Sequence, residues 1–192
     1  MIVDQECAVI PNYLSAEGNT VTNNFLCILT GVVLLSGLAQ ITIPLPWTPV
    51  PITGQTLGVA LTALLWGRAR GTAVVLGYLV LGAVGVPVFA LGRSGISVGP
   101  TFGYLLGMIV AAYVMGSMAD RGWTRKFWQT YFTAVLGSGI TFCFGLIGLS
   151  FFIPHENLLA AGLFPFLPGD LIKTFLASSI AFKTQNLWKR NI

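Results

Sequence analysis

The chain has 192 residues, a mean hydropathy of +0.81 and only 8% charged residues, against about 25% charged residues in an ordinary soluble domain. Between Gly18 and Ala119 the only charged residues are Arg68, Arg70 and Arg93, so this stretch cannot form the charged shell of a water-soluble protein. The net charge of +4 comes from short basic clusters at the ends of apolar runs, which excludes the continuous basic stripe of a nucleic-acid-binding protein. We therefore expect an all-α integral membrane protein with no nucleic-acid partner and with the lipid bilayer as its surroundings.

The N-terminal segment differs from the rest of the chain in its charges. It contains Asp4, Glu6 and Glu17 but no Lys or Arg, so it lacks the basic start of a cleaved signal peptide. We expect residues 1–24 to form an N-terminal cytoplasmic tail. No repeat, low-complexity tract or long linker divides the remainder, so residues 25–192 are expected to form one transmembrane domain.

Apolar runs separated by turn residues follow this tail. A run needs about 20 helical residues to cross the hydrocarbon core of a bilayer, and by this criterion the sequence predicts about six membrane-spanning helices. The first run ends at a cluster of prolines, which cannot continue a helix. The expected spans are Phe25–Ile43, Gln55–Trp66, Gly71–Val86, Thr101–Ala119, Thr130–Phe152 and a last span that starts after Pro168 and Gly169 and ends near Trp188.

The distribution of basic residues predicts the orientation. Cytoplasmic loops of membrane proteins are enriched in Lys and Arg. Basic residues follow the second, fourth and last spans, whereas the opposite loops contain only Arg93. We therefore expect a multi-pass protein of the cell membrane, inner or plasma membrane, with both termini in the cytoplasm. The basic residues on the cytoplasmic side are Arg68, Arg70, Arg121, Arg125, Lys126, Lys189 and Arg190.

Two unusual loops are expected on the outer side. Thr42–Gln55 is apolar and rich in proline, so it should pack against protein at membrane depth. Phe89–Pro100 is rich in glycine and carries Arg93. Together the two loops are expected to cover a cavity that opens outward.

Small residues recur in and before the fourth span. Gly99, Gly103, Gly107 and Ala111 occur at intervals of four residues, which would place them on one face of a helix. Small residues at this spacing let helix backbones approach closely in lipid. The pattern indicates either packing within the chain or a docking face for a partner subunit.

The sharpest polar signal is the pair Asp170 and Lys173, three residues apart at the start of the last span in an otherwise apolar segment. Ionisable groups at such depth are costly and usually face a cavity or a partner. The pair predicts a ligand site, or alternatively a salt bridge in a structural membrane protein without a transport role. Arg93 is a candidate clamp for a carboxylate, because a guanidinium can bind both carboxylate oxygens, or alternatively a headgroup-level arginine in a mobile loop.

Further candidates lie near the outer ends of the spans, where aromatic and amide side chains can form the walls and hydrogen bonds of a small-molecule pocket. An interfacial belt of such residues is the alternative. These candidates are Trp47, Gln55, Tyr78 and Tyr104.

The sequence lacks the patterns of an enzyme. The sole histidine, His155, has no second metal ligand nearby, which gives no support to a metal site. Neither a phosphate-binding loop nor a nucleophile elbow is present. We expect no enzymatic activity and no cofactor, and other subunits must supply energy for any uphill transport.

Four segments in order carry a family resemblance: IPLPWTPVPITGQTLGVALTALLWGRARG, LGAVGVPVFA, GPTFGYLLG and PFLPGDLIK. They closely resemble the BioY family, the biotin-binding S-components of energy-coupling-factor (ECF) transporters, over about Gly37 to Phe182. The resemblance implies a six-helix S-component bundle that binds biotin near its outer face. It also implies assembly with an ECF transmembrane coupling subunit and two cytoplasmic ATPase subunits, and binding roles for Asp170 and Lys173.

Biotin presents a ureido ring with two N–H donors and one carbonyl, and a carboxylate tail. The working hypothesis is that Asp170 accepts a hydrogen bond from a ureido N–H and that Lys173 or Arg93 pairs with the carboxylate. Another carboxylate-bearing vitamin, such as pantothenate, is the alternative substrate. S-components commonly carry an Ala-rich face on the first helix for the coupling subunit, and the nearest analogue here is Cys27 and Gly31.

Overall fold

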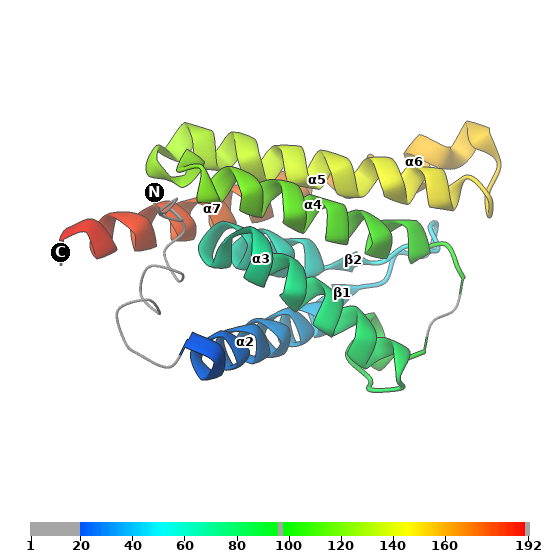
Figure 1. The fold of residues 1–192 in the computed structure, drawn as a ribbon. Coiled ribbons are helices and arrows are strands. Elements are labelled where there is room, and N and C mark those ends of the chain that lie inside the picture. The colour runs from blue at the N-terminus through cyan, green and yellow to red at the C-terminus, as the bar shows by residue number, and fades with distance from the viewer. Residues whose placement is uncertain (1–19, 96–97, 191–192) are drawn as a thin grey trace.

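The computed structural model describes residues 20–95 and 98–190, and most of the expected N-terminal tail lies outside these described residues. The fold is a bundle of helices with one two-stranded antiparallel hairpin (Figure 1). Its elements are α2 (Thr20–Gln40), β1 (Thr42–Ile43), β2 (Ile52–Thr53), α3 (Gln55–Ala83), α4 (Phe102–Asp120), α5 (Phe127–Leu149), α6 (Leu158–Gly162) and α7 (Leu167–Arg190), with 3-10 turns at Ala90–Gly92, Trp123–Arg125 and His155–Asn157.

The helices have the length and composition of membrane spans. Among the described residues, α3, α4, α5 and the part of α2 from Val21 are each long and apolar enough to cross a membrane. The bent pair His155–Gly162 and Leu167–Leu187, with an angle of 42°, makes a further span if it is counted as one. The expected all-helical membrane fold is therefore confirmed. The expected bounds Phe25–Ile43 of the first span are wrong at both ends. The helix already includes Thr20, and it ends at Gln40 because Thr42–Ile43 pairs with β2 in the hairpin.

Helix α3 is folded back on itself at Gly67. The φ of 76° and ψ of −173° at this residue are not helical, and a positive φ favours glycine. The side chains of Gln55 and Tyr78 form a hydrogen bond of 2.6 Å across a separation of 23 residues, which would span about 35 Å in a continuous helix. The two halves therefore run antiparallel, and they contain the residues of Gln55–Trp66 and those of Gly71–Val86 as far as Ala83.

The small residues of α4 pack against α5. A Cβ atom on Gly103 would lie 2.9 Å from the Cα of Gly148, and one on Gly107 would lie 2.9 Å from the Cβ of Phe144. Ala111 is fully buried. These contacts are within the chain. The expectation that Gly99 shares this helical face is wrong, because α4 begins only at Phe102 and the residue before a proline is disfavoured in a helix.

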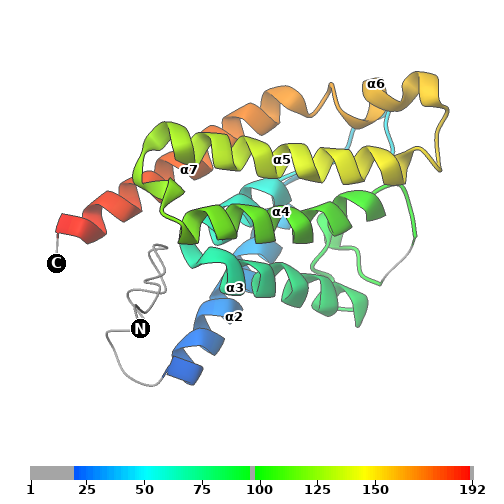
Figure 2. The ribbon, with the colours of Figure 1, turned by 45° about the horizontal axis from the view of Figure 1, so that its top comes forward.

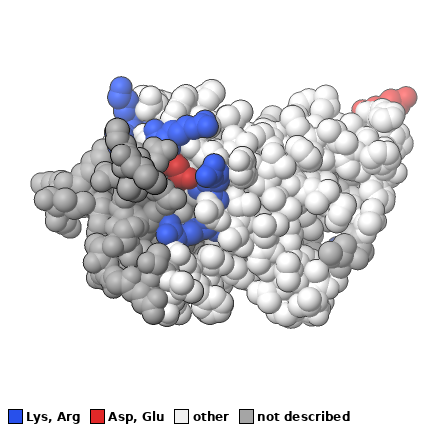
Figure 3. Space-filling model, viewed as in Figure 1, with Lys and Arg blue, Asp and Glu red and all other residues white. Residues whose placement is uncertain are grey.

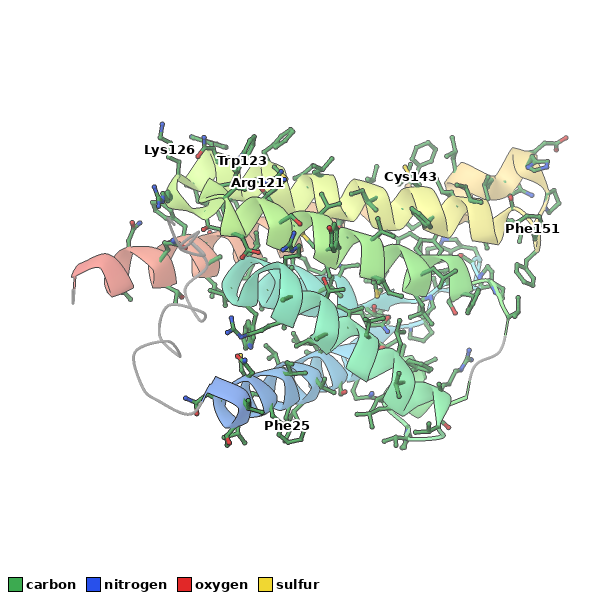
Figure 4. All side chains as sticks on the ribbon, in the orientation of Figure 1. Phe25, Arg121, Trp123, Lys126, Cys143 and Phe151 are labelled. Carbon is green, nitrogen blue, oxygen red and sulfur yellow. The ribbon has the colours of Figure 1, made fainter. Side chains whose placement is uncertain are left out.

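The small face of α2 also contacts the chain itself. A Cβ on Gly31 would lie 2.5 Å from a methyl group of Val74 in the second half of α3. The backbone carbonyl of Cys27 accepts a hydrogen bond of 3.1 Å from the indole N–H of Trp66. The opposite side of α2, which includes Phe25 at 65% exposure (Figure 4), is apolar and uncovered by the described chain.

Basic side chains gather at one end of the bundle, where α2 begins and α7 ends (Figures 1 and 3). At this end the backbone N–H of Arg68 donates to Asp120 Oδ2 at 3.0 Å, and Arg70 Nε donates to Asn24 Oδ1 at 2.8 Å. Lys126 lies at the same end in Figure 4. The expected segregation of basic loops to one side is confirmed, and the candidate site lies toward the other end.

Candidate functional site

A cavity of about 320 Å³ lies beneath the two unusual loops, within the range of about 300–1,000 Å³ that is typical of small-molecule sites. The hairpin side contributes Val50, Pro51 and Thr53. The glycine-rich loop contributes Phe89, Ala90, Leu91, Arg93, Ser94 and Gly95. Both of the expected loops therefore line one cavity. The remaining lining comes from segments 55–56, 101–108 and 138–142, together with Leu79, Phe166 and Lys173.

Gln55 lines this cavity at the start of α3, and the buried side chain of Tyr78 contacts the side chain of Gln55. The amide of Gln55 donates to Tyr78 Oη at 2.6 Å, and its Oε1 accepts from the hydroxyl of Thr53 at 2.9 Å. Tyr78 is fully buried and is not part of the lining. Its ring packs edge-on against Phe89, with ring centroids 5.4 Å apart. This network holds the Gln55 amide in one orientation toward the cavity.

The two other aromatic candidates differ in position. Tyr104 lines the cavity, and its hydroxyl donates to the carbonyl of Gly162 at 2.7 Å, which ties α4 to α6. Trp47 is 65% exposed and does not line the cavity. It lies in the turn between β1 and β2, where the chain reverses. The structure therefore does not bring Trp47 to the site.

Lys173 places a cation in the cavity wall. Its ammonium donates to Thr56 Oγ1 at 2.7 Å and to the backbone carbonyl of Thr53 at 3.1 Å. An ammonium group has three N–H donors, so one remains for a ligand. The two hydrogen bonds also join α7 to the end of the hairpin, because Thr53 belongs to β2.

Asp170 lies beside the cavity but not in its wall. It is buried, with 5% exposure, and lines a second cavity of about 10 Å³. The two cavities share the side chains of Thr56, Ser138, Thr141 and Lys173. Among the described residues, no ion pair within 4.0 Å joins Asp170 to Lys173. The structure thus offers no support for the alternative in which the two residues merely form a salt bridge.

Arg93 is exposed and lines the mouth of the cavity. Its carbonyl accepts from the N–H of Phe89 at 3.0 Å, which closes a tight loop. Within this loop Leu91 and Gly92 have φ values of 62° and 65°. A positive φ is costly for leucine, so surrounding contacts must hold the loop in place.

Gln40 provides such contacts, although no sequence pattern marks it as a functional residue. From the end of α2 its Nε2 lies 3.1 Å from the carbonyl oxygen of Val88 and 3.2 Å from that of Phe89, while its Oε1 accepts from the N–H of Gly92 at 3.1 Å. One amide side chain therefore fastens the arginine-bearing loop to the first helix. The only available signal was a glutamine at the end of an apolar run, which does not reveal its partners 48 and more residues away.

The site combines apolar walls with a surplus of positive charge. Lys173 and Arg93 line the larger cavity, and among the described residues the one carboxylate that lines either cavity, Asp170, lies in the smaller one. Among residues 20–95 and 98–190, no group of three or more His, Cys, Asp or Glu side chains is placed to hold a metal ion. This arrangement suits a small organic anion with hydrogen-bonding groups at its other end.

Comparisons with known proteins give one consistent result. The model of the BioY family matches residues 12–190. The chain is similar to the biotin transporter BioY of Thermotoga maritima (38% identity over 149 residues, 76% of this chain and 86% of that protein) and to that of Rhizobium etli (33% over 181 residues, 86% and 91%). Its fold resembles the crystal structure of the S-component for biotin from an ECF-type ABC transporter, with a TM-score of 0.81 and 26% identity over 88% of this chain and 94% of that chain.

Proposed function

The chain belongs to the BioY family, and we propose that it is the biotin-binding membrane subunit of an ECF-type uptake transporter. The observation that carries this proposal is a cavity of about 320 Å³, lined by Lys173 and Arg93, within a fold that matches the S-component for biotin at a TM-score of 0.81. The similar proteins are named as transporters, and the chain is a multi-pass protein of the cell membrane.

We further propose the six-pass topology that was expected from the sequence. The passes are α2, the two halves of α3 on either side of Gly67, α4, α5 and the bent pair of α6 and α7. The reversal of the chain at Gly67 supports counting α3 as two passes. The basic end of the bundle would face the cytoplasm together with both termini, and the cavity would then open to the outside.

The proposal includes partner subunits. The sequence has no phosphate-binding loop of the Walker type, so ATP hydrolysis would take place in two cytoplasmic ATPase subunits joined through an ECF transmembrane coupling subunit. The similarity to an S-component from an ECF-type transporter supports this arrangement. The chain itself would bind and release the vitamin.

The positions of the two cations favour one orientation of biotin. Arg93 is exposed at the mouth of the cavity, so it suits the flexible carboxylate tail, which it can bind through two hydrogen bonds. Lys173 is partly buried and has one N–H left, which suits the ureido carbonyl. Asp170 would accept a hydrogen bond from a ureido N–H, and Phe89 and Tyr104 would enclose the apolar rings.

Isothermal titration of the purified protein in nanodiscs tests the proposal. We expect biotin to bind and pantothenate not to bind. Asp170→Asn should weaken biotin binding by about tenfold or more, because a lost hydrogen bond to a buried charged group costs roughly 1.5–3 kcal/mol. Glu156→Gln, which changes an exposed outer carboxylate, is the matched control and should bind as the unaltered protein does. A folded protein that ignores biotin would overturn the proposed function, and one that binds pantothenate instead would reassign the substrate.

A further inference from the structure

The small cavity beside the ligand site contains two buried polar atoms without partners. Asp170 Oδ1 and Ser138 Oγ are both enclosed near one another, and neither forms a hydrogen bond of 3.5 Å or less with a described residue. Their residues are 5% and 7% exposed. Buried polar groups in folded proteins are nearly always hydrogen-bonded to protein or to ordered water. Two such atoms in the wall of one cavity therefore indicate a shared partner.

The size and lining of this cavity fit a single water molecule. Its volume is about 10 Å³, which is close to the minimum that one water requires. A buried water typically makes two to four hydrogen bonds. Ser138 can donate to it and Asp170 can accept from it. The hydroxyl of Thr141 donates to the carbonyl of Gly137 at 3.1 Å, so its lone pairs remain free to accept the second hydrogen of the water.

A metal cation is a poorer fit for the same space. Asp170 is the only carboxylate that the described residues contribute to the lining, and Lys173 lines the cavity as well. A cation would have to approach that ammonium at short range, where like charges repel. A neutral water that donates to Asp170 and accepts from Ser138 meets no such repulsion.

We propose that one ordered water joins Ser138 Oγ to Asp170 Oδ1 and that Ser138 is a positioning residue for biotin binding. The two residues come from neighbouring helices, α5 and α7, which pack against each other (Figure 2), and both line the small cavity. The water holds Oδ1 and so fixes the rotation of the carboxylate, which leaves Oδ2 for the ureido contact. This inference rests on the proposed function, because its main readout is biotin affinity.

A double-mutant cycle tests whether Ser138 acts through Asp170. We expect Ser138→Ala to weaken biotin binding by about threefold to tenfold when Asp170 is present, and by less than about twofold in the Asp170→Asn background. Ser179→Ala is the matched control, since its exposed hydroxyl donates only to the carbonyl of Phe175 in its own helix, and it should leave the affinity unchanged. Thermal unfolding in the same nanodiscs confirms that each variant is folded.

Each outcome of the cycle decides the question. Equal losses in both backgrounds would mean that Ser138 contacts the ligand independently of Asp170, and no loss in either would mean that it has no role. Both results overturn the inference while leaving the proposed function intact, provided that the unaltered protein binds biotin. Ser138→Val, which fills the cavity with a larger apolar side chain, provides a second test and should weaken binding more than Ser138→Ala.

Two further measurements identify the occupant. A high-resolution crystal structure of the unaltered protein should show one water density within hydrogen-bond distance of both Asp170 and Ser138. Biotin titrations in sodium, potassium and choline chloride should give the same affinity. A density with the short, multiple oxygen contacts of a metal ion, or an affinity that requires sodium, would replace the water by a cation and overturn the proposal.

Discussion

Gln40 holds the loop that carries Arg93, and its side chain does not line the cavity. Replacing Gln40 should therefore weaken biotin binding indirectly, through the loop. Gln40→Leu removes the three hydrogen bonds to Val88, Phe89 and Gly92. Each such bond is worth about 0.5–1.5 kcal/mol, and the lower figure applies here because the amide is exposed. The loss of about 1.5 kcal/mol corresponds to about a tenfold weaker affinity if the loop must be ordered for biotin to bind.

Gln40→Glu removes the N–H donors of the Gln40 side chain and keeps its acceptor oxygen. The carboxylate can still accept from the N–H of Gly92, but it places negative charge against the carbonyl oxygens of Val88 and Phe89. We therefore expect a loss at least as large as that of Gln40→Leu.

Dissociation of radiolabelled biotin from nanodiscs is the assay, because a loosened loop should mainly raise the dissociation rate. Gln129→Leu at the start of α5, far from the cavity along the helix, is the matched control. An affinity within twofold of the unaltered protein for a correctly folded Gln40→Leu variant would refute this reasoning.

Three further predictions concern single side chains. Lys173→Gln should weaken biotin binding by more than about tenfold in a titration, since a partly buried charge is lost, and an unchanged affinity would exclude a direct contact. Gly103→Ala should lower the unfolding temperature, because a Cβ at Gly103 would lie 2.9 Å from the Cα of Gly148 and such overpacking costs about 1–3 kcal/mol. Gly139→Ala should leave the unfolding temperature unchanged, because nothing lies within 4 Å of a Cβ at Gly139. Equal unfolding temperatures for the two variants would contradict this prediction. Trp47→Ala should leave the dissociation constant within twofold, as its ring is 65% exposed, and a larger loss would return Trp47 to the site.

The helices could be predicted because their signals are local. An apolar run with a proline cluster at its end defines α2 without knowledge of any other part of the chain. The reversal at Gly67 was also anticipated, because the basic residues Arg68 and Arg70 interrupt two runs that are each short for a span. The position of Lys173 in the cavity wall follows from the cost of an ionisable group in an apolar segment.

The supporting residues could not be predicted because their partners are distant in sequence. Gln40 reaches a loop 48 residues away, and Tyr78 meets Gln55 only because α3 folds back. The orientation of a side chain in a turn is equally hidden, so the sequence placed Trp47 in the site and the structure does not. No sequence pattern distinguishes Ser138 from other small residues of a membrane helix, and its proposed role depends on α7 bringing Asp170 to the same small cavity.

The two loops over the cavity are held in different ways, and this difference can be tested. Lys173 donates a hydrogen bond to the carbonyl of Thr53 at the end of β2 and also lines the cavity, so its loss should release the hairpin and remove the proposed ligand contact together. Gln40 holds the glycine-rich loop and does not line the cavity, so its loss should release that loop alone. If holding the cover closed limits release, Gln40→Leu should raise the dissociation rate and leave the association rate nearly unchanged. Lys173→Gln should in addition lower the association rate of biotin, because electrostatic attraction mainly speeds the association of an anion with its site.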